Sequence, residues 1–277
     1  MINYSLDSSR VHDTIVLENI ISQMQKTKKE ILSTHKNFIL EDYEVYKANA
    51  GTLDKIKPDQ RITTKCGEYL SKTYDSSPRD LGELKRTIKD SLPAVLRAKC
   101  PFCMISKHNT FDHYLGKGTY PEYSLFSYNL IPACSECNSK KSTKLLDEHG
   151  NRLFLHFIYD EIPDYPFLVY KLSVKNGRIV LDKIVLDFPE NESRAALIKN
   201  HFSELNLFER LADEFDVMAS TIQSEYEGIE STPGGIKKAL RKRMRSLEEN
   251  CGINYWETCF LRAIINSQEI LALLGDN

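Results

Sequence analysis

The sequence predicts an α+β protein that is mainly helical, with an embedded strand–strand–helix module stapled by zinc and a small antiparallel hairpin. Three observations lead to this fold class. Apolar residues recur at helical spacing over most of the chain. Two Cys-x-x-Cys pairs, Cys100 with Cys103 and Cys134 with Cys137, frame a short central stretch. An Asn-Gly pair at 176–177 separates two runs rich in Val, Ile, Leu and Tyr, which is typical of a hairpin.

Length and composition limit the classes of protein that fit. The chain has 277 residues, of which 41% are hydrophobic and 27% charged, as in ordinary globular proteins. The formal net charge is −2, so any contact with nucleic acid has to come from a local basic patch. No apolar run approaches the length of a membrane span, and the first residues lack the pattern of a signal peptide. We therefore expect a cytoplasmic protein with no membrane contact.

We divide the sequence into a helical N-terminal region (1–94), a metal-rich module (95–150) and a C-terminal region with a hairpin and helices (151–277). In the first region we expect a helix over 9–48, with room for a break, and another over 64–74. Its role is either plain scaffold or an arm that binds a partner or clamps DNA.

A third N-terminal helix is expected to start at Ser77, as the capping residue, with Pro78 at the first helical position, and to run through Lys89. In the C-terminal region a strand is expected over 153–159. The hairpin strands are expected at 167–174 and 178–188. The remaining C-terminal segments are expected to be helices: 192–205, 207–226, 236–249 and 255–274.

The seven cysteines indicate a metal site rather than a disulfide framework, because their number is odd and four are grouped in pairs. Four thiolates at this spacing predict a closed, structural zinc site formed by Cys100, Cys103, Cys134 and Cys137. A redox dithiol is the alternative, but it would be a single pair at a helix start. The scattered cysteines are expected to be buried, inert thiols: Cys66, Cys251 and Cys259.

Polar residues lie inside this cysteine frame and beside it. Asp112-His113 belongs to a short extended run, Asn129 to a second one, and Asn138 follows the last cysteine in a predicted helix. This order of strand, loop, strand and helix, with these residues at these places, resembles the HNH or ββα-metal endonuclease family over about fifty residues. Many members of that family carry histidine where this chain has Asn138, and others carry asparagine there.

The resemblance implies a role for each residue. His113 would be the general base, Asp112 and Asn138 would bind a catalytic metal, and Asn129 would hydrogen-bond the loop backbone and fix His113. The chemistry agrees, because phosphodiester hydrolysis needs an activated water and neutralisation of charge at phosphorus. A neutral imidazole is a suitable general base near pH 7. A carboxylate and an amide oxygen suit Mg²⁺ or Mn²⁺.

Other histidines and basic residues complete the candidates. His108 is expected at the surface, and His156, amid apolar residues, is expected to be a core histidine. The basic helix near 237–245 is either a phosphate-binding face or an ordinary solvated face. The cations that would meet DNA phosphates are Lys140, Lys141, Lys144, Lys237, Lys238, Arg241, Lys242, Arg243 and Arg245.

A wider resemblance links the run from Asp112 to Lys141 and the strand after it to the HNH effectors of bacterial antiphage systems, of Septu type or associated with retrons. In such systems an ATPase or sensor protein holds the nuclease in check. The resemblance therefore implies a regulatory partner. The competing interpretation is a non-catalytic zinc-binding module that grips nucleic acid or protein, and a third is a homing or restriction enzyme with its own sequence specificity.

Overall fold

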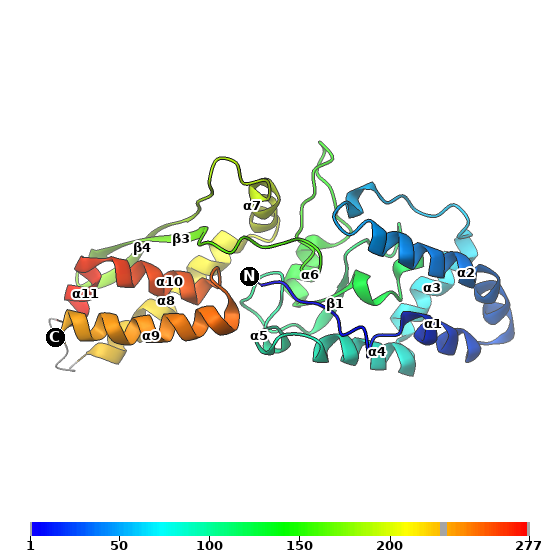
Figure 1. Cartoon of the computed structure of the whole chain (residues 1–277), viewed down its shortest axis with the longest axis horizontal. Coiled ribbons are helices and arrows are strands. Elements are labelled where there is room, and N and C mark those ends of the chain that lie inside the picture. Colours follow the sequence, from blue (N-terminus) through cyan, green and yellow to red (C-terminus); the bar gives the residue numbers. More distant parts are fainter. Residues whose placement is uncertain (1, 228–231, 276–277) are drawn as a thin grey trace. The chain divides into compact units, whose positions relative to one another are not determined.

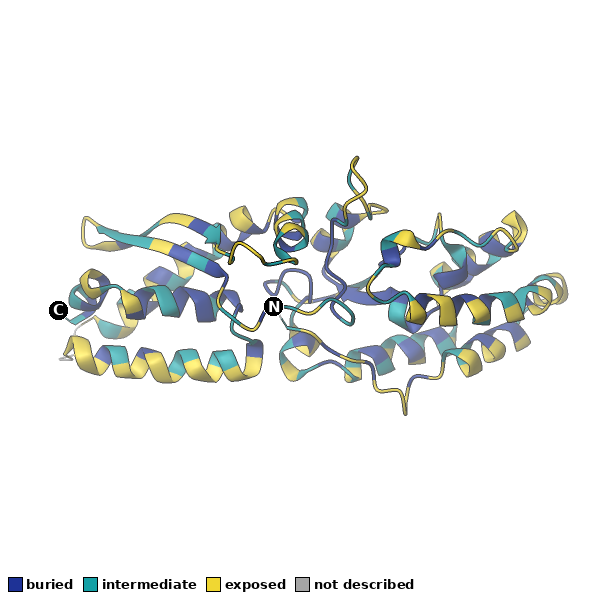
Figure 2. Ribbon diagram, turned by 45° about the horizontal axis from the view of Figure 1, so that its top comes forward, coloured by how far each residue is buried: buried dark blue, intermediate teal, exposed yellow. Residues whose placement is uncertain are grey.

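A computed structural model of the chain describes residues 2–227 and 232–275. Within these residues the protein is mainly helical and has two small two-stranded antiparallel sheets, which confirms the predicted fold class (Figure 1). Many helices bury one side and expose the other, as an amphipathic pattern requires (Figure 2). None of the described helices is long and apolar enough to cross a membrane.

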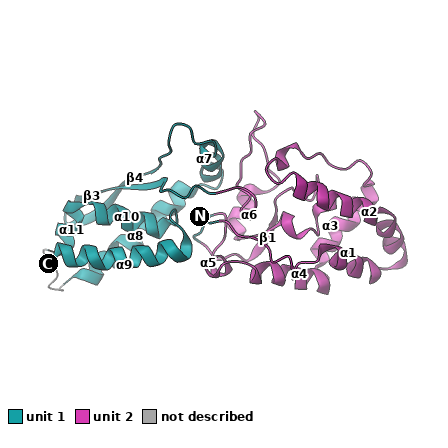
Figure 3. Cartoon of the chain, viewed as in Figure 1, with its two compact units in different colours: residues 1–2, 103–105, 162–277 teal, residues 3–102, 106–161 magenta. Residues whose placement is uncertain are grey.

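The chain forms two compact units (Figure 3). The N-terminal unit consists of residues 3–102 and 106–161. The C-terminal unit consists of Ile2, residues 103–105 and the described part of 162–277. The N-terminal helices and most of the metal-rich module therefore lie in the same unit.

The helices that precede the cysteine-rich stretch include one short 3₁₀ turn. They are α1 (Asp13–Ser22), α2 (Lys26–Ala48), η1 (Leu53–Lys55), α3 (Thr64–Ser76), α4 (Arg79–Asp90) and α5 (Ala94–Ala98). The single helix predicted over 9–48 is thus two helices, and α1 packs against both α2 and α4. The break allows apolar residues of both helices, such as Ile20 and Leu32, to be buried.

The boundary between α3 and α4 differs from the prediction. Ser77 ends α3 in the left-handed conformation, with φ of 45°, and does not cap α4. Pro78 occupies the capping position of α4 and makes no side-chain cap, so the first helical residue is Arg79. The start of α3 is capped by Thr63, whose Oγ1 accepts a hydrogen bond from the Cys66 amide at 3.3 Å.

The metal-rich module folds as two strands and a helix. Its elements are β1 (Thr110–His113), η2 (Pro121–Tyr123), η3 (Ser127–Asn129), β2 (Leu130–Ala133) and α6 (Ser135–Lys141). β1 pairs antiparallel with β2, so that Thr110 faces Ala133 and His113 faces Leu130. The predicted order of strand, loop, strand and helix is therefore found.

The strand predicted over 153–159 is not formed. Residues 153–157 are buried but irregular. The carbonyl of Phe157 accepts hydrogen bonds from the Tyr4 amide at 3.1 Å and from the Asn3 side chain at 3.1 Å, so its backbone is satisfied without a strand partner.

The C-terminal unit contains the hairpin and five helices in its described residues. Its elements are β3 (Leu168–Lys175), β4 (Arg178–Leu186), α7 (Ala195–Glu204), α8 (Leu207–Tyr226), α9 (Pro233–Cys251), α10 (Trp256–Asn266) and α11 (Gln268–Gly275). Asn176 and Gly177 have φ of 53° and 70°, as the predicted type I′ turn requires. The helix predicted over 255–274 is divided at Ser267, which is extended and whose Oγ accepts from the Ile270 amide at 3.2 Å.

A buried carboxylate in the N-terminal unit has an unusual pKa. Asp42 on α2 is 5% exposed. Burial, and then the nearby carboxylates of Asp59 and Glu122, raise its pKa to about 8, whereas Arg61 lowers it. The Arg61 guanidinium lies 3.7 Å from the Asp42 carboxylate. Asp42 therefore keeps a proton at neutral pH in the folded protein.

We predict that the stability of the Asp42→Asn variant falls less with rising pH than the stability of the wild type. Between pH 4 and 8 the folded state holds a proton that the unfolded chain has released, so wild-type stability falls as pH rises through this window. Melting temperatures at pH 5, 6.5 and 8 should decline less steeply in the variant. The exposed substitution Asp90→Asn serves as control, and equal slopes in all three proteins would contradict the assignment.

Candidate functional site

Four buried cysteines converge at one point of the structure. The Sγ atoms of Cys100, Cys103, Cys134 and Cys137 all lie within 4.8 Å of one another. Tetrahedral zinc with Zn–S bonds of about 2.3 Å needs sulfurs about 3.8 Å apart, so the cluster fits a structural zinc ion. The second pair is built into the start of α6, where the Cys134 Sγ accepts from the Cys137 amide at 3.4 Å. Zinc would thereby fix the first turn of α6.

We predict that Cys134→Ser lowers both the zinc content and the stability of the protein, because it removes one of four ligands of a closed site. Zinc can be measured by elemental analysis and stability by thermal unfolding. Cys66→Ser, the same exchange at a buried thiol outside the cluster, should keep the full zinc content. Equal zinc in the two variants would argue against the site.

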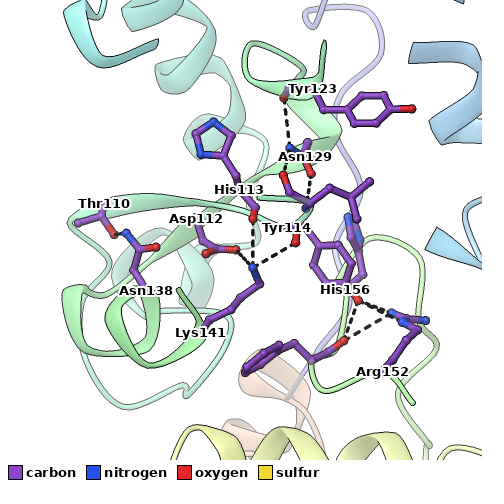
Figure 4. Close-up of polar contacts among 12 residues, drawn as sticks. Thr110, Asp112, His113, Tyr114, Tyr123, Asn129, Asn138, Lys141, Arg152 and His156 are labelled. Atoms are coloured by element: carbon purple, nitrogen blue, oxygen red, sulfur yellow. Dashed lines mark hydrogen bonds and ion pairs between the residues drawn. The ribbon is translucent and has the colours of Figure 1, made fainter. Parts of the chain in front are cut away.

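α6 and β1 bring the candidate metal ligand Asp112 against a lysine (Figure 4). The Lys141 Nζ lies 2.9 Å from the Asp112 Oδ2, and both side chains are 1% exposed. Lys141 also donates to the carbonyl oxygens of His113 at 3.0 Å and Tyr114 at 3.1 Å. This ammonium group is buried, and each of its three N–H donors has a partner. The expectation that Lys141 contacts a DNA phosphate therefore does not fit the structure. Lys140 is half-buried and Lys144 is exposed.

The Asp112 carboxylate is buried and has one ammonium group beside it. Burial raises its pKa above the ordinary range, while the ammonium group of Lys141 works in the opposite direction. Burial therefore outweighs the one ion pair. Asn138 donates from Nδ2 to the Thr110 Oγ1 at 3.2 Å, and Thr110 donates to the Ala133 carbonyl at 2.9 Å. The Asn138 Oδ1 is then the atom suited to a hard cation.

The imidazole of His113 points away from the Asp112 carboxylate (Figure 4). Its Nε2 lies 3.0 Å from the Ser124 carbonyl oxygen, which can only accept, so Nε2 carries the proton and Nδ1 bears the lone pair. Burial lowers the pKa of His113 to about 4, although the Ser124 hydrogen bond favours the charged form. The ring is 9% exposed and packs edge-on against Tyr74 with centroids 4.2 Å apart. His113 is thus neutral at pH 7.

Asn129 ties together the β1–β2 loop, residues 114–129. Its buried Oδ1 accepts from the Leu115 amide at 2.7 Å and from the Tyr46 hydroxyl at 3.1 Å. Its Nδ2 donates to the carbonyls of Leu115 at 3.0 Å and Tyr123 at 3.2 Å. Tyr123 directly precedes Ser124, the residue that holds His113. Asn129 therefore holds the backbone of this loop at Leu115 and at Tyr123.

The other histidines of this unit differ in outcome. His108 is 5% exposed, so its expected surface position is wrong. His156 is a buried core histidine, as expected. Its Nε2 lies 3.1 Å from the Tyr128 carbonyl, and burial lowers its pKa to about 3. Sequence reasoning missed Tyr46 and Tyr74, which contact Asn129 and His113 from helices far away in the chain.

The basic helix α9 carries its cations on an exposed face of the C-terminal unit, with Leu240 buried beneath. A pocket of about 1050 Å³ is lined by Lys237, Lys238, Arg241, Lys242 and Arg245, together with small and polar residues. Arg243 instead forms an ion pair with Glu225 of α8 at 3.1 Å. Five of the six predicted cations therefore share one surface.

Two known proteins are similar to parts of this chain. Protein ea31 of Escherichia phage lambda is 35% identical over 92 residues, which is 31% of this chain and 31% of that protein. Septu protein PtuB of Bacillus thuringiensis is 38% identical over 64 residues, 21% of this chain and 25% of PtuB. The match thus spans less than a third of each relative. No family model and no solved structure matches the chain.

We predict that Lys141→Ala lowers the free energy of unfolding by about 3–5 kcal/mol, because it leaves the Asp112 carboxylate buried without its ion-pair partner. Denaturant unfolding at neutral pH measures the change. Lys140→Ala, at the half-buried neighbouring position, should change stability by only about 0.5 kcal/mol. If the two variants have the same free energy of unfolding, the Asp112–Lys141 pair does not stabilise the fold as predicted.

Proposed function

We propose that this chain is a metal-dependent endonuclease that hydrolyses phosphodiester bonds of DNA. The observation that carries the proposal is the imidazole of His113, anchored on the Ser124 carbonyl, next in sequence to the buried carboxylate of Asp112, with Asn138 on helix α6, which also carries a cysteine of the cluster. The partial likeness to Septu protein PtuB and to ea31 supports it independently of the geometry.

In this proposal His113 is the general base. With the Nε2 proton held by the Ser124 carbonyl, Nδ1 is the atom that takes a proton from the attacking water. Its lowered pKa keeps it unprotonated at pH 7, so it is ready to accept. Asn129 is a positioning residue, because it bonds the Tyr123 carbonyl next to Ser124 and so fixes the loop that orients the imidazole.

Asp112 and Asn138 would hold one Mg²⁺ or Mn²⁺ through their side-chain oxygens. When bound, the ion supplies charge neutralisation at the phosphate. Asn138 is prepared for this task because Thr110 orients its amide. Lys141 binds Asp112 and the carbonyls of His113 and Tyr114 at the end of β1, and so keeps the carboxylate and α6 in a fixed relation to β1.

The biological role we propose is that of an antiphage effector controlled by a partner such as an ATPase or sensor protein. Support for it comes from the relative named Septu protein PtuB, which matches 21% of this chain. The alternative is a non-catalytic zinc-binding module that grips nucleic acid or another protein. The cysteine cluster fits both, so only the residues around His113 separate them.

We predict that the protein nicks or linearises plasmid DNA with Mg²⁺ or Mn²⁺, that EDTA stops the reaction, and that His113→Ala slows it at least about 100-fold. Gel analysis of the plasmid measures the rate. His149→Ala, at an exposed histidine, is the matched control and should cut normally. A His113→Ala protein that keeps its zinc, its fold and the wild-type rate would refute the base assignment.

Two further variants separate the nuclease from the binding module in the same assay. Asp112→Asn and Asn138→Ala should raise the concentration of Mg²⁺ needed for half-maximal cleavage, since each weakens one ligand. A protein that binds DNA but cuts with neither metal, alone or with its regulatory partner present, would favour the non-catalytic alternative.

A further inference from the structure

A basic pocket lies beside the candidate site within the N-terminal unit. It has a volume of about 610 Å³. It is lined by Lys85, Arg86 and Lys89 of α4, and by residues that include Phe111 of β1 and Asn138 of α6. No sequence pattern singled out these cations, because α4 also carries acids and is close to neutral as a whole.

The helical period separates the charges of α4. Leu81, Leu84 and Ile88 are buried. Gly82 lies on the pocket side, one turn before Lys85 and Arg86, and a side chain there would meet nothing within 4 Å. The glycine therefore leaves the pocket open next to the cations.

The acids of α4 are bound elsewhere. Glu83 pairs with Arg79 at 2.9 Å, and Asp90 pairs with Arg10 at 3.6 Å. Asp80 accepts hydrogen bonds from the side chains of Asn19 and Gln23 on the α1 side. Over the described part of the chain, no carboxylate forms an ion pair with Lys85, Arg86 or Lys89. The three cations of the pocket wall thus have no ion-pair partner among the described residues.

Aromatic rings hold the lysines at the pocket. The Lys85 Nζ lies 3.9 Å from the ring centroid of Tyr74, and the Lys89 Nζ lies 5.3 Å from that of Phe111. Burial lowers the pKa of Lys85, the carboxylate of Asp75 raises it, and the ammonium groups of Lys117 and Lys89 have smaller lowering effects. A bound anion would relieve this crowding of like charge.

The pocket reaches one candidate site residue directly and a second through an aromatic ring. Asn138, the candidate metal ligand, lines it. Tyr74 also lines it and packs edge-on against the ring of His113, with centroids 4.2 Å apart. An anionic chain lying along α4 would therefore pass Asn138 and the ring that covers His113.

We propose that this α4 pocket binds the sugar–phosphate backbone of DNA next to the bond to be cut, with Lys85, Arg86 and Lys89 contacting phosphates. The inference rests on the proposed function and names where its substrate lies. Cations contacting phosphates position a nucleic acid without reading its sequence. The pocket would thus bind DNA of any sequence beside the catalytic centre.

Binding measured apart from cleavage tests the proposal. Fluorescence anisotropy of a labelled DNA duplex is followed against the full, zinc-loaded chain carrying His113→Ala, in buffer without Mg²⁺ or Mn²⁺, over a range of salt concentrations. Adding Lys85→Gln and Lys89→Gln should weaken binding on every duplex sequence and reduce the slope of log affinity against log salt by about 2. The matched control, Lys26→Gln with Lys29→Gln on the exposed side of α2, removes equal charge from the same unit and should leave the slope unchanged.

A conservative pair keeps the test decisive if the glutamine variant is poorly folded. Lys85→Arg with Lys89→Arg preserves charge and should retain both affinity and salt slope. Wild-type binding by a zinc-loaded glutamine variant, or lost binding by the arginine variant, would overturn the proposal. The two hypotheses can be rejected separately. If the protein does not cleave DNA but the glutamine variant loses binding, the nuclease is rejected and the α4 pocket is not. If cleavage depends on His113 but the glutamine variant binds DNA as before, the α4 pocket is rejected and the nuclease is not.

Discussion

The buried carboxamide of Asn129 is the interaction on which the candidate site depends. Its oxygen accepts two hydrogen bonds and its nitrogen donates two, so every donor and acceptor of the amide has a partner. A buried polar group that loses its partner costs about 1–3 kcal/mol. A β1–β2 loop of another shape would lose several of these bonds together. The loop is therefore held in one conformation, and the Ser124 carbonyl that anchors His113 is held with it.

Asp112 and His113 are neighbours in sequence with opposite environments. Side chains alternate along a strand, so the carboxylate turns toward Lys141 and the imidazole toward Ser124. Burial acts on both, and it favours the uncharged form of each. For the histidine this yields a neutral imidazole at pH 7, with a pKa of about 4. For the aspartate it raises the pKa despite the ion pair. One short strand thus places two titratable groups in different environments because its faces differ.

Features set by a few neighbouring residues could be predicted from the sequence, and contacts across long chain separations could not. Each Cys-x-x-Cys pair and the turn at Asn176 depend on local geometry, and the repeated pair spacing indicated that the two pairs meet. The Tyr46–Asn129 bond joins residues 83 positions apart, and no periodic pattern encodes it. The apolar run at 153–159 failed as a strand because its carbonyl at Phe157 is satisfied from the N-terminus. The burial of Lys141 had a local signal, since it lies one helical turn after the buried Cys137.

The two basic helices show why the density of charge in a sequence differs from the charge of a surface. α9 concentrates six cations within nine residues, and it stands out in the sequence for that reason. α4 mixes cations with acids, and only its packing separates them: Glu83 and Asp90 find arginines, while three cations remain on the pocket side. Because α4 shares one compact unit with β1 and α6, its cations line one pocket with Asn138, and Lys85 lies over the Tyr74 ring that packs on His113. For the proposed reaction, which has to align a phosphate with the imidazole of His113, this fixed placement matters more than the number of charges.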